Sequence, residues 1–210
     1  MAKKRALGPE KTLFPLHASL NELAKAAKDC KACDLWKRGT QTVFGEGGPN
    51  AKVMLVGEQP GNQEDLKGKP FVGPAGKLLD AALKEAGIDR RKVYVTNAVK
   101  HFKWEPRGKR RIHKKPNGAE IAACRPWLDA EIAALQPKVI VCLGATAAQA
   151  LLGRDFRVTQ HRGEFLNSPL VPVMMATVHP SSILRAPDEQ TRHNEMERFI
   201  DDLKKVSKLV

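Results

Sequence analysis

Four short runs of continuously apolar residues stand out along the chain, each bounded by polar or glycine-rich residues. They cover residues 52–57 (KVMLVG), 92–97 (KVYVTN), 138–144 (KVIVCLG) and 172–178 (PVMMATV). An apolar run of this length without alternation is typical of a strand that is buried on both faces. We therefore predict four strands of a parallel sheet.

Helical spacing of apolar residues fills most of the segments around these strands. We predict helices over about 19–28, 74–86, 117–135, 145–152 and 188–208. The first opens with a Ser-x-x-Glu capping box and the third with an Asn-x-x-Glu box, and Pro126 should kink or break the third. Strands that alternate with helices predict an α/β fold with three αβα layers and a central four-stranded parallel sheet.

Polar residues capable of chemistry follow the predicted strands. In open parallel sheets, ligands bind beyond the carboxyl ends of the strands. The candidate segments there are GEQPG at 57–61, Asn97 with the basic stretch after it, Leu143-Gly144-Ala145 and HPSS at 179–182. Each signal is weak alone, because a glycine-rich turn and a hydrogen-bonded histidine are common features of ordinary folds. Phe71 lies outside the periodic segments, where it is either a base-stacking ring or a core residue of its loop.

The charge of the chain is +13 over 210 residues, and it is concentrated in one place. Residues 100–116 hold eight Lys or Arg and a single Glu. A local excess of this kind favours a nucleic-acid partner, although a solvated loop or a localisation signal has the same composition. We predict a basic flexible tail over 1–15 and a single domain over 16–210, with an inserted basic loop at about 103–117.

No apolar run approaches the roughly 20 residues that cross a membrane, and the basic N-terminus lacks the apolar core of a secretory signal. We therefore expect a cytoplasmic protein that does not bind membranes and acts as a monomer. Cys30 and Cys33 form a CxxC pair, and Cys124 and Cys142 follow far downstream. Four thiols in a cytosolic chain indicate a structural zinc or a [4Fe–4S] cluster, although Cys142 within a buried strand is also typical of a core residue.

Taken together, the motifs resemble a known family. CKAC, GEQPG, KPFVGPAGKLLD, YVTNAVKH, the two later cysteines and VHPSSILR follow the order and approximate spacing of the iron–sulfur uracil-DNA glycosylases over about residues 20–205. Gln59 and the inserted KRRIH resemble the UdgX branch, whose members become covalently attached to uracil-DNA. The resemblance implies a uracil-DNA glycosylase-like fold, uracil-containing DNA as substrate (we expect single-stranded DNA to be preferred) and free uracil as product. It also implies a [4Fe–4S] cluster on Cys30, Cys33, Cys124 and Cys142.

The resemblance also implies roles for individual residues. The uracil-binding residues are Gln59, Phe71, Asn97 and His179, of which Phe71 stacks on the base, Asn97 reads its amide edge and His179 hydrogen-bonds the departing uracil. The DNA-binding residues are Lys100, Lys109, Arg110, Arg111, Ser181, Ser182 and Arg185.

The catalytic set is His113, Glu58, Gln59 and His179. Distant relatives hold an aspartate that positions water where this chain has Gln59, and an amide does not accept a proton from water. Neutral imidazole is a competent nucleophile, and we expect His113 to attack the sugar in a single turnover. Neighbouring Lys and Arg residues should keep it neutral; Glu58 should orient its other ring nitrogen. Asn62 stands where the UdgX pattern GEQPGD has an acid, which should lower the rate or the efficiency of linkage.

Three alternatives stay open at this point. The chain is also compatible with a multiple-turnover iron–sulfur uracil-DNA glycosylase in which His113 only assists. It is compatible with a non-catalytic iron–sulfur protein that binds uracil-DNA, in which His113 contacts a base or phosphate. A nucleotide-binding α/β protein with a structural zinc is the third.

Overall fold

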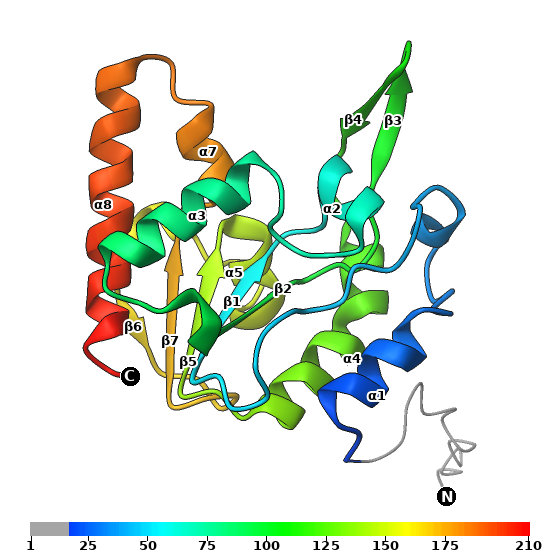
Figure 1. The fold of residues 1–210 in the computed structure, drawn as a ribbon, viewed down its shortest axis with the longest axis horizontal. Coiled ribbons are helices and arrows are strands. Elements are labelled where there is room, and N and C mark those ends of the chain that lie inside the picture. Colours follow the sequence, from blue (N-terminus) through cyan, green and yellow to red (C-terminus); the bar gives the residue numbers. More distant parts are fainter. Residues whose placement is uncertain (1–16) are drawn as a thin grey trace, which may run out of the picture.

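The computed structural model describes residues 17–210, and its centre is a five-stranded sheet in the order β2-β1-β5-β7-β6 (Figure 1). Four strands are parallel and match those predicted: β1 (Val53–Gly57), β2 (Val93–Asn97), β5 (Val139–Leu143) and β7 (Val173–Thr177). The fifth, β6 (Phe165–Leu166), runs antiparallel to β7 and corrects the prediction of four strands. It is too short to produce a detectable sequence period. The tail predicted over 1–15 lies outside the described residues.

The strands are buried on both faces, as continuous apolar runs require. Every residue of β1, β2 and β5 is buried, and β1 lies between the other two, with Val53 opposite Val93 on one side and Val139 on the other. Successive side chains of a strand point to opposite faces of the sheet, so each strand contributes residues to two separate apolar cores, one on each face.

One core packs beneath α3 (Pro74–Glu85), α7 (Pro180–Leu184) and α8 (Glu189–Ser207) (Figure 1). Leu79 and Leu83 of α3 contribute to it, as do Phe199 and Leu203 of α8, and all four are fully buried. The helices α3 and α8 therefore cover the sheet with the apolar sides that their spacing predicted, whereas α7 was not predicted.

The opposite face is covered by α4 (Gly118–Leu135) and α5 (Ala145–Leu152), and α1 (Leu20–Ala27) packs against α4. Both predicted capping boxes are present, at the starts of α1 and α4. Of the predicted kink or break at Pro126, the break is wrong, since α4 runs through this residue as one helix; the kink stays a prediction. Short helical segments complete the layers: η1 (Asp34–Lys37), α2 (Asn62–Lys67), η2 (Arg90–Lys92) and α6 (Val158–His161).

The basic insertion is an antiparallel hairpin that projects from the body of the protein, where a loop was predicted (Figure 1). It consists of β3 (Trp104–Arg107) and β4 (Arg110–His113), joined by a turn in which Gly108 takes a φ of 58°. The N–H of Lys114 donates to the carbonyl of Lys103 at 3.0 Å and closes the base of the hairpin. His113, at the end of β4, is thus held where the hairpin meets the sheet.

Over residues 17–210, none of the helices is both long and apolar enough to cross a membrane.

Candidate active site

The carboxyl ends of the central strands open into a cavity of about 770 Å³. Eight of the predicted catalytic and binding residues line it: Glu58, Gln59, Phe71, Asn97, His113, His179, Ser181 and Arg185. They come from segments that are far apart in sequence, and the parallel sheet brings them to one edge.

A narrow slot in this cavity is built from the end of β2 and the loop before α3. A Cβ atom at Gly57 would lie 2.3 Å from Asn97 Oδ1 and 2.7 Å from Phe71 Cζ, so only glycine permits this approach. Phe71 takes a φ of 55°, in the left-handed region that a bulky residue rarely occupies. Its ring lies 6.0 Å from the His179 ring, with an angle of 28° between the planes. The slot therefore offers an aromatic face and an amide to a flat, polar-edged ligand.

His179 presents a hydrogen-bond donor to this slot. Its Nδ1 accepts from the backbone N–H of Ser181 at 3.1 Å and lies 2.8 Å from the Ser181 hydroxyl, so this nitrogen carries the lone pair. Burial, followed by the nearby positive charge of Arg185, lowers the pKa of His179 to about 4. The ring is therefore neutral at pH 7, and Nε2 carries its proton.

Glu64 joins the loop after β1 to the loop before α3, and the sequence reasoning missed it. Its carboxylate accepts from the N–H of Gly61 at 3.1 Å and from the N–H of Gly73 at 2.6 Å. A buried carboxylate that accepts two backbone N–H groups fixes both loops relative to each other. The signal was available, because Glu64 stands three residues after Gly61 at capping-box spacing.

His113 reaches the same cavity from the hairpin. Its Nε2 lies 3.5 Å from Glu58 Oε1 and accepts a hydrogen bond from the side-chain amide of Gln59 at 2.8 Å. The other Glu58 oxygen accepts from the hydroxyl of Thr146 in α5. Glu58 thus faces the nitrogen that points into the cavity, which corrects the prediction that it orients the other one.

Gln59 is also committed to the hairpin. Its Oε1 accepts from the N–H of Lys103 at 3.0 Å, and its Nε2 donates to the carbonyl of Lys114 at 2.9 Å. Only 7% of its surface is exposed. These contacts give Gln59 a positioning role: it fixes the base of the hairpin and, through it, the imidazole of His113.

The pKa of His113 is lowered, as predicted, but for a different reason. Burial is the largest cause, and the positive charge of Arg185 adds to it, while the Glu58 carboxylate acts in the opposite direction. The neighbouring basic residues of the hairpin, which the sequence reasoning invoked, are not among the causes. Neutral imidazole is the form in which a nitrogen lone pair is available to react.

Arg111, predicted to bind DNA, anchors the hairpin to the body. Its guanidinium pairs with the fully buried Asp65 at 2.6 Å and donates through Nε to Asn62 Oδ1 at 2.6 Å. The same group lies 5.5 Å from the centres of the Phe102 and Trp104 rings. Its side chain keeps 19% exposure, so the DNA-binding role of Arg111 stays a prediction beside this anchoring role.

The DNA-binding prediction for Lys100 is also wrong. Its side chain is only 1% exposed and pairs with Glu131 at 2.5 Å, beneath the end of β2. A buried ammonium cannot reach a phosphate. Lys100 stands in a segment rich in Lys and Arg, so its sequence context gave no sign that it belongs to the core.

The remaining residues predicted to bind DNA lie in different surroundings. Lys109 and Arg110 are exposed at the hairpin turn, and Arg185 lines the cavity. The hydroxyl of Ser182 donates to the carbonyl of His179 at 2.7 Å, within the first turn of α7. Sequence reasoning did not find Leu184, an apolar residue that lines the cavity and is 40% exposed.

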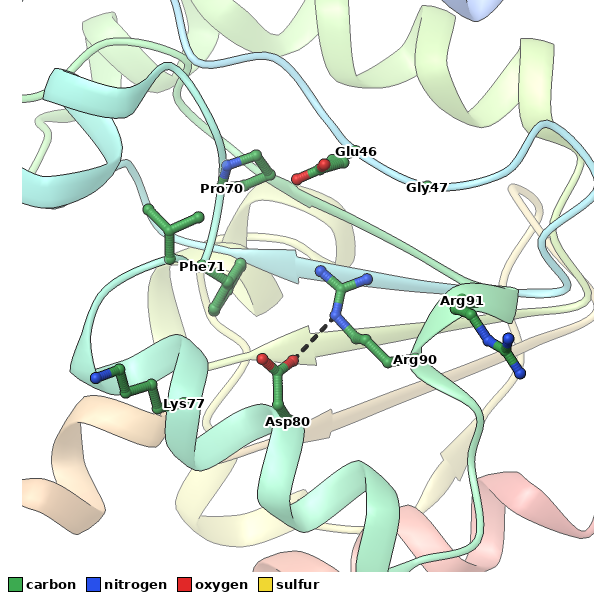
Figure 2. A pocket seen from close by; sticks show the side chains of 9 residues that line it. Glu46, Gly47, Pro70, Phe71, Lys77, Asp80, Arg90 and Arg91 are labelled. Atoms are coloured by element: carbon green, nitrogen blue, oxygen red, sulfur yellow. Dashed lines mark hydrogen bonds and ion pairs between the residues drawn. The ribbon is translucent and has the colours of Figure 1, made fainter.

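A second, smaller pocket of about 450 Å³ lies beyond Phe71, with Phe71 as a shared wall (Figure 2). Its rim is charged, and the ion pair of Arg90 with Asp80, at 3.1 Å, crosses it. Phe71 is thus the one residue that lines both pockets, and it separates them.

The predicted cluster ligands separate into a group of three and one distant cysteine. Cys30, Cys33 and Cys124 pack in one core cluster, whereas Cys142 is fully buried in β5 within another. The charges of Cys30 and Cys33 contribute to the raised pKa of Cys124, behind burial as the main cause. Over residues 17–210, no three metal-binding side chains are already gathered closely enough to hold an ion.

Each of the three grouped sulfurs has an N–H donor. The indole of Trp127 donates to Cys30 Sγ and the N–H of Lys100 to Cys124 Sγ, both at 3.2 Å. A backbone hydrogen bond from Leu35 acts on Cys33 and opposes the rise of its pKa that burial causes. Such donors suit thiolates that bind iron or zinc, so these three residues fit a cluster. The fourth ligand, Cys142, stays a prediction.

The fold and cavity define an α/β protein with a ligand cavity at the carboxyl edge of its sheet, lined by two histidines, Phe71, Asn97 and basic residues. Residues 44–204 match the uracil DNA glycosylase superfamily, and the chain belongs to that family. It is 37% identical to the type-4 uracil-DNA glycosylase of Sulfurisphaera tokodaii over 91% of this chain and 84% of that protein. It is also 37% identical to the type-4 enzyme of Thermotoga maritima, over 90% of this chain and 93% of the relative.

Proposed function

We propose that the protein excises uracil from DNA and becomes covalently attached, through His113, to C1′ of the deoxyribose. The observation that carries this proposal is the position of His113 Nε2, which faces the base-binding cavity 3.5 Å from a carboxylate oxygen of Glu58. The names of the type-4 relatives support the first step, and the UdgX-like motif around His113 supports the second.

Excision begins when the uracil nucleotide leaves the base stack and enters the slot. Phe71 stacks on the base, and the Asn97 amide donates and accepts at its edge. As the bond between C1′ and N1 breaks, its electron pair leaves with uracil. The proton on His179 Nε2 then stabilises the negative charge on the uracil oxygen, which is how a fixed donor accelerates bond cleavage.

Attachment follows at the other side of the sugar. The lone pair of His113 Nε2, released from Gln59, forms a bond to C1′, and the Glu58 carboxylate stabilises the positive charge that develops on the ring. His113 loses its Nδ1 proton to solvent and uracil gains one, so the products are a protein–DNA conjugate and neutral uracil. The alkylated imidazole is a poor leaving group, and each molecule reacts once.

The exposed basic residues would bind the DNA backbone. Lys109 and Arg110 extend the positive surface from the hairpin turn, and Arg185 continues it at the cavity rim. We propose single-stranded DNA as the preferred substrate, since its bases need no unpairing, and a monomer acting in the cytoplasm.

A [4Fe–4S] cluster held by Cys30, Cys33 and Cys124, with Cys142 as the predicted fourth ligand, would stabilise the fold around α1 and α4. Iron and sulfide analysis of the purified protein, together with its visible absorbance, tests this assignment. We expect about four irons per chain. Stoichiometric zinc in a colourless protein would overturn it, and Cys142→Ala with full iron content would remove Cys142 from the ligand set.

The decisive experiment is a denaturing gel after incubation with uracil-containing single-stranded DNA. We expect a shifted band that resists heat and detergent, and its loss in His113→Ala. Free abasic DNA with repeated turnover would instead indicate an ordinary glycosylase, and intact DNA would indicate a binding protein. A band that persists in His113→Ala would exclude His113 as the nucleophile.

His113→Ser provides a second test of the same step. A small hydroxyl cannot take the place of imidazole as the nucleophile, but it leaves room for water at C1′. We expect this variant to release uracil and abasic DNA over several turnovers. A His113→Ser protein that neither cross-links nor excises would contradict the separation of the two steps.

A further inference from the structure

An ion pair with almost no solvent contact joins the segment between β2 and the hairpin to α4. The side chains of Lys100 and Glu131 are 1% and 0% exposed, and their charged atoms are 2.5 Å apart. Glu131 comes from α4, so the pair joins this helix to the segment that leaves the sheet. Removing two charges from water is costly, and a buried ion pair is weak grounds for stability by itself.

The ammonium of Lys100 is directed at the backbone of Asn97. Nζ donates to the carbonyl of Asn97 at 2.7 Å and to the hydroxyl of Thr96 at 2.6 Å, in addition to Glu131. All three ammonium protons therefore have acceptors. Asn97 is the last residue of β2, and without this donor its buried carbonyl would lose a charged partner.

Glu131 is held in place by two side chains of β2 and by one backbone group of the segment before β1. The hydroxyls of Tyr94 and Thr96 donate to its carboxylate at 2.8 and 2.9 Å, and the N–H of Gly45 donates at 3.2 Å. Burial and the adjacent Glu131 charge raise the pKa of Tyr94, so its hydroxyl stays a donor. The network is fully connected, and such networks fix geometry.

This network lies behind the residue that reads the base. Tyr94 and Thr96 face α4, and because side chains alternate along a strand, Asn97 points to the opposite face and into the cavity. The N–H of Lys100 also donates to Cys124 Sγ at 3.2 Å, which fixes the segment at a second point. The backbone of Asn97 is thus held by contacts on one face of the sheet, and its side-chain amide lies on the other face, in the cavity.

We propose that Lys100 and Glu131 are positioning residues that set the Asn97 amide for uracil. The inference rests on the proposed function and assigns to this pair the discrimination of uracil from cytosine, whose base edge carries different hydrogen-bonding groups. Neither residue touches the substrate. Both act by fixing the carbonyl, and hence the backbone angles, of the residue that does.

The test is the double variant Lys100→Met with Glu131→Gln, which removes both charges and keeps the approximate volumes. The iron-loaded protein is given DNA strands with one uracil or one cytosine at the same position, and binding and the rate of uracil release are measured. We expect the release rate to fall by about 10- to 100-fold, as for a misplaced reactive group, and the preference in binding for uracil over cytosine to fall with it. Affinity for the cytosine strand and iron content should not change.

Leu135→Ala is the matched control, because it removes a buried side chain from the same helix with no contact to Asn97. It should lower the melting temperature and leave the preference for uracil intact. A double variant that behaves like this control would overturn the proposal. If the double variant does not fold, Thr96→Val decides: a reduced preference for uracil supports the proposal, and an unchanged one overturns it. Wild-type protein that releases no uracil would refute the proposed function instead.

Discussion

The cavity joins two regions that are built in opposite ways. The side that we propose to bind the base consists of Asn97, Phe71 and His179, which stand at the ends of buried strands or on loops tied together by Glu64. The other side carries His113 on a two-stranded hairpin that stands away from the sheet. The first region owes its geometry to a packed core, and the second to a few polar contacts. Recognition of the base and attack on the sugar should therefore respond differently to mutation.

The largest effect is expected from breaking the base-binding side. Phe71 is 8% exposed and separates two hollows, so Phe71→Ala should destabilise the protein by about 3–5 kcal/mol and abolish measurable uracil binding. Chemical denaturation and DNA titration measure the two effects. Phe165→Ala, at a position that is 48% exposed on β6, is the control and should change stability by about 0.5 kcal/mol or less. Equal losses of stability and of uracil binding in both variants would contradict the role assigned to Phe71.

Loosening the hairpin should affect attachment more than binding. Gln59→Leu removes the amide that holds Lys103, Lys114 and His113, and a displacement of His113 by about 1 Å should slow cross-linking by about 100-fold. Cross-linking at saturating DNA measures this rate. Gln63→Leu changes another cavity-lining glutamine and should leave the rate near wild type. If Gln59→Leu weakens binding while the rate at saturation is unchanged, the two regions are not separable.

Acid should slow attachment by protonating the nucleophile. The pKa of His113 is lowered from its usual 6.5, so the ring is neutral at pH 7 and the cross-linking rate should be constant from pH 7 to 8. Below the lowered pKa the rate should fall about tenfold for each pH unit, because protonation removes the lone pair. His179, with a pKa of about 4, stays neutral across most of this range. A rate that still rises between pH 7 and 8 would contradict a neutral His113; DNA binding at each pH is the control.

The smallest effect is expected from restoring an acid at position 62. Asn62 accepts from Arg111 at 2.6 Å, and Asn62→Asp would add a charge–charge attraction at an exposed site. We expect a gain in stability of about 0.3–1 kcal/mol and a few-fold faster cross-linking at most. Gln63→Asp also adds an acid in the first turn of α2 and isolates the effect of the helix end. Equal gains in both variants would show that the contact with Arg111 contributes nothing.

Local patterns were sufficient for the layers of the fold and most of the cavity. The four parallel strands are continuous apolar runs, and their carboxyl ends carry Glu58, Asn97 and His179, so the topology alone brings these residues together. The hairpin was missed because WEPRGKRRIH has no apolar face that would reveal a strand. Its geometry depends on Gln59 and Asp65, which lie far away in the chain.

Charged residues produced the clearest error, at Lys100, and a missed anchoring role, at Arg111. Sequence reasoning places Lys and Arg on the surface, where they usually are. Lys100 is buried because Glu131, in a helix 31 positions downstream, supplies its counter-charge, and Arg111 is retained by Asp65, 46 positions upstream. Pairings at such separations leave no periodic trace in either segment.

The closed base of the hairpin has a consequence for how this protein could arise and be used. Because Lys103 and Lys114 are joined by a backbone hydrogen bond, the chain enters and leaves the arm at nearly the same point. An arm of this kind can be gained by a single insertion without redrawing the sheet beneath it. Under the proposed function, such an insertion would be enough to turn a reusable catalyst into one that reacts once. The hairpin could then be grafted, together with the glutamine that holds its base, onto a related protein to obtain a base-selective covalent tag for DNA.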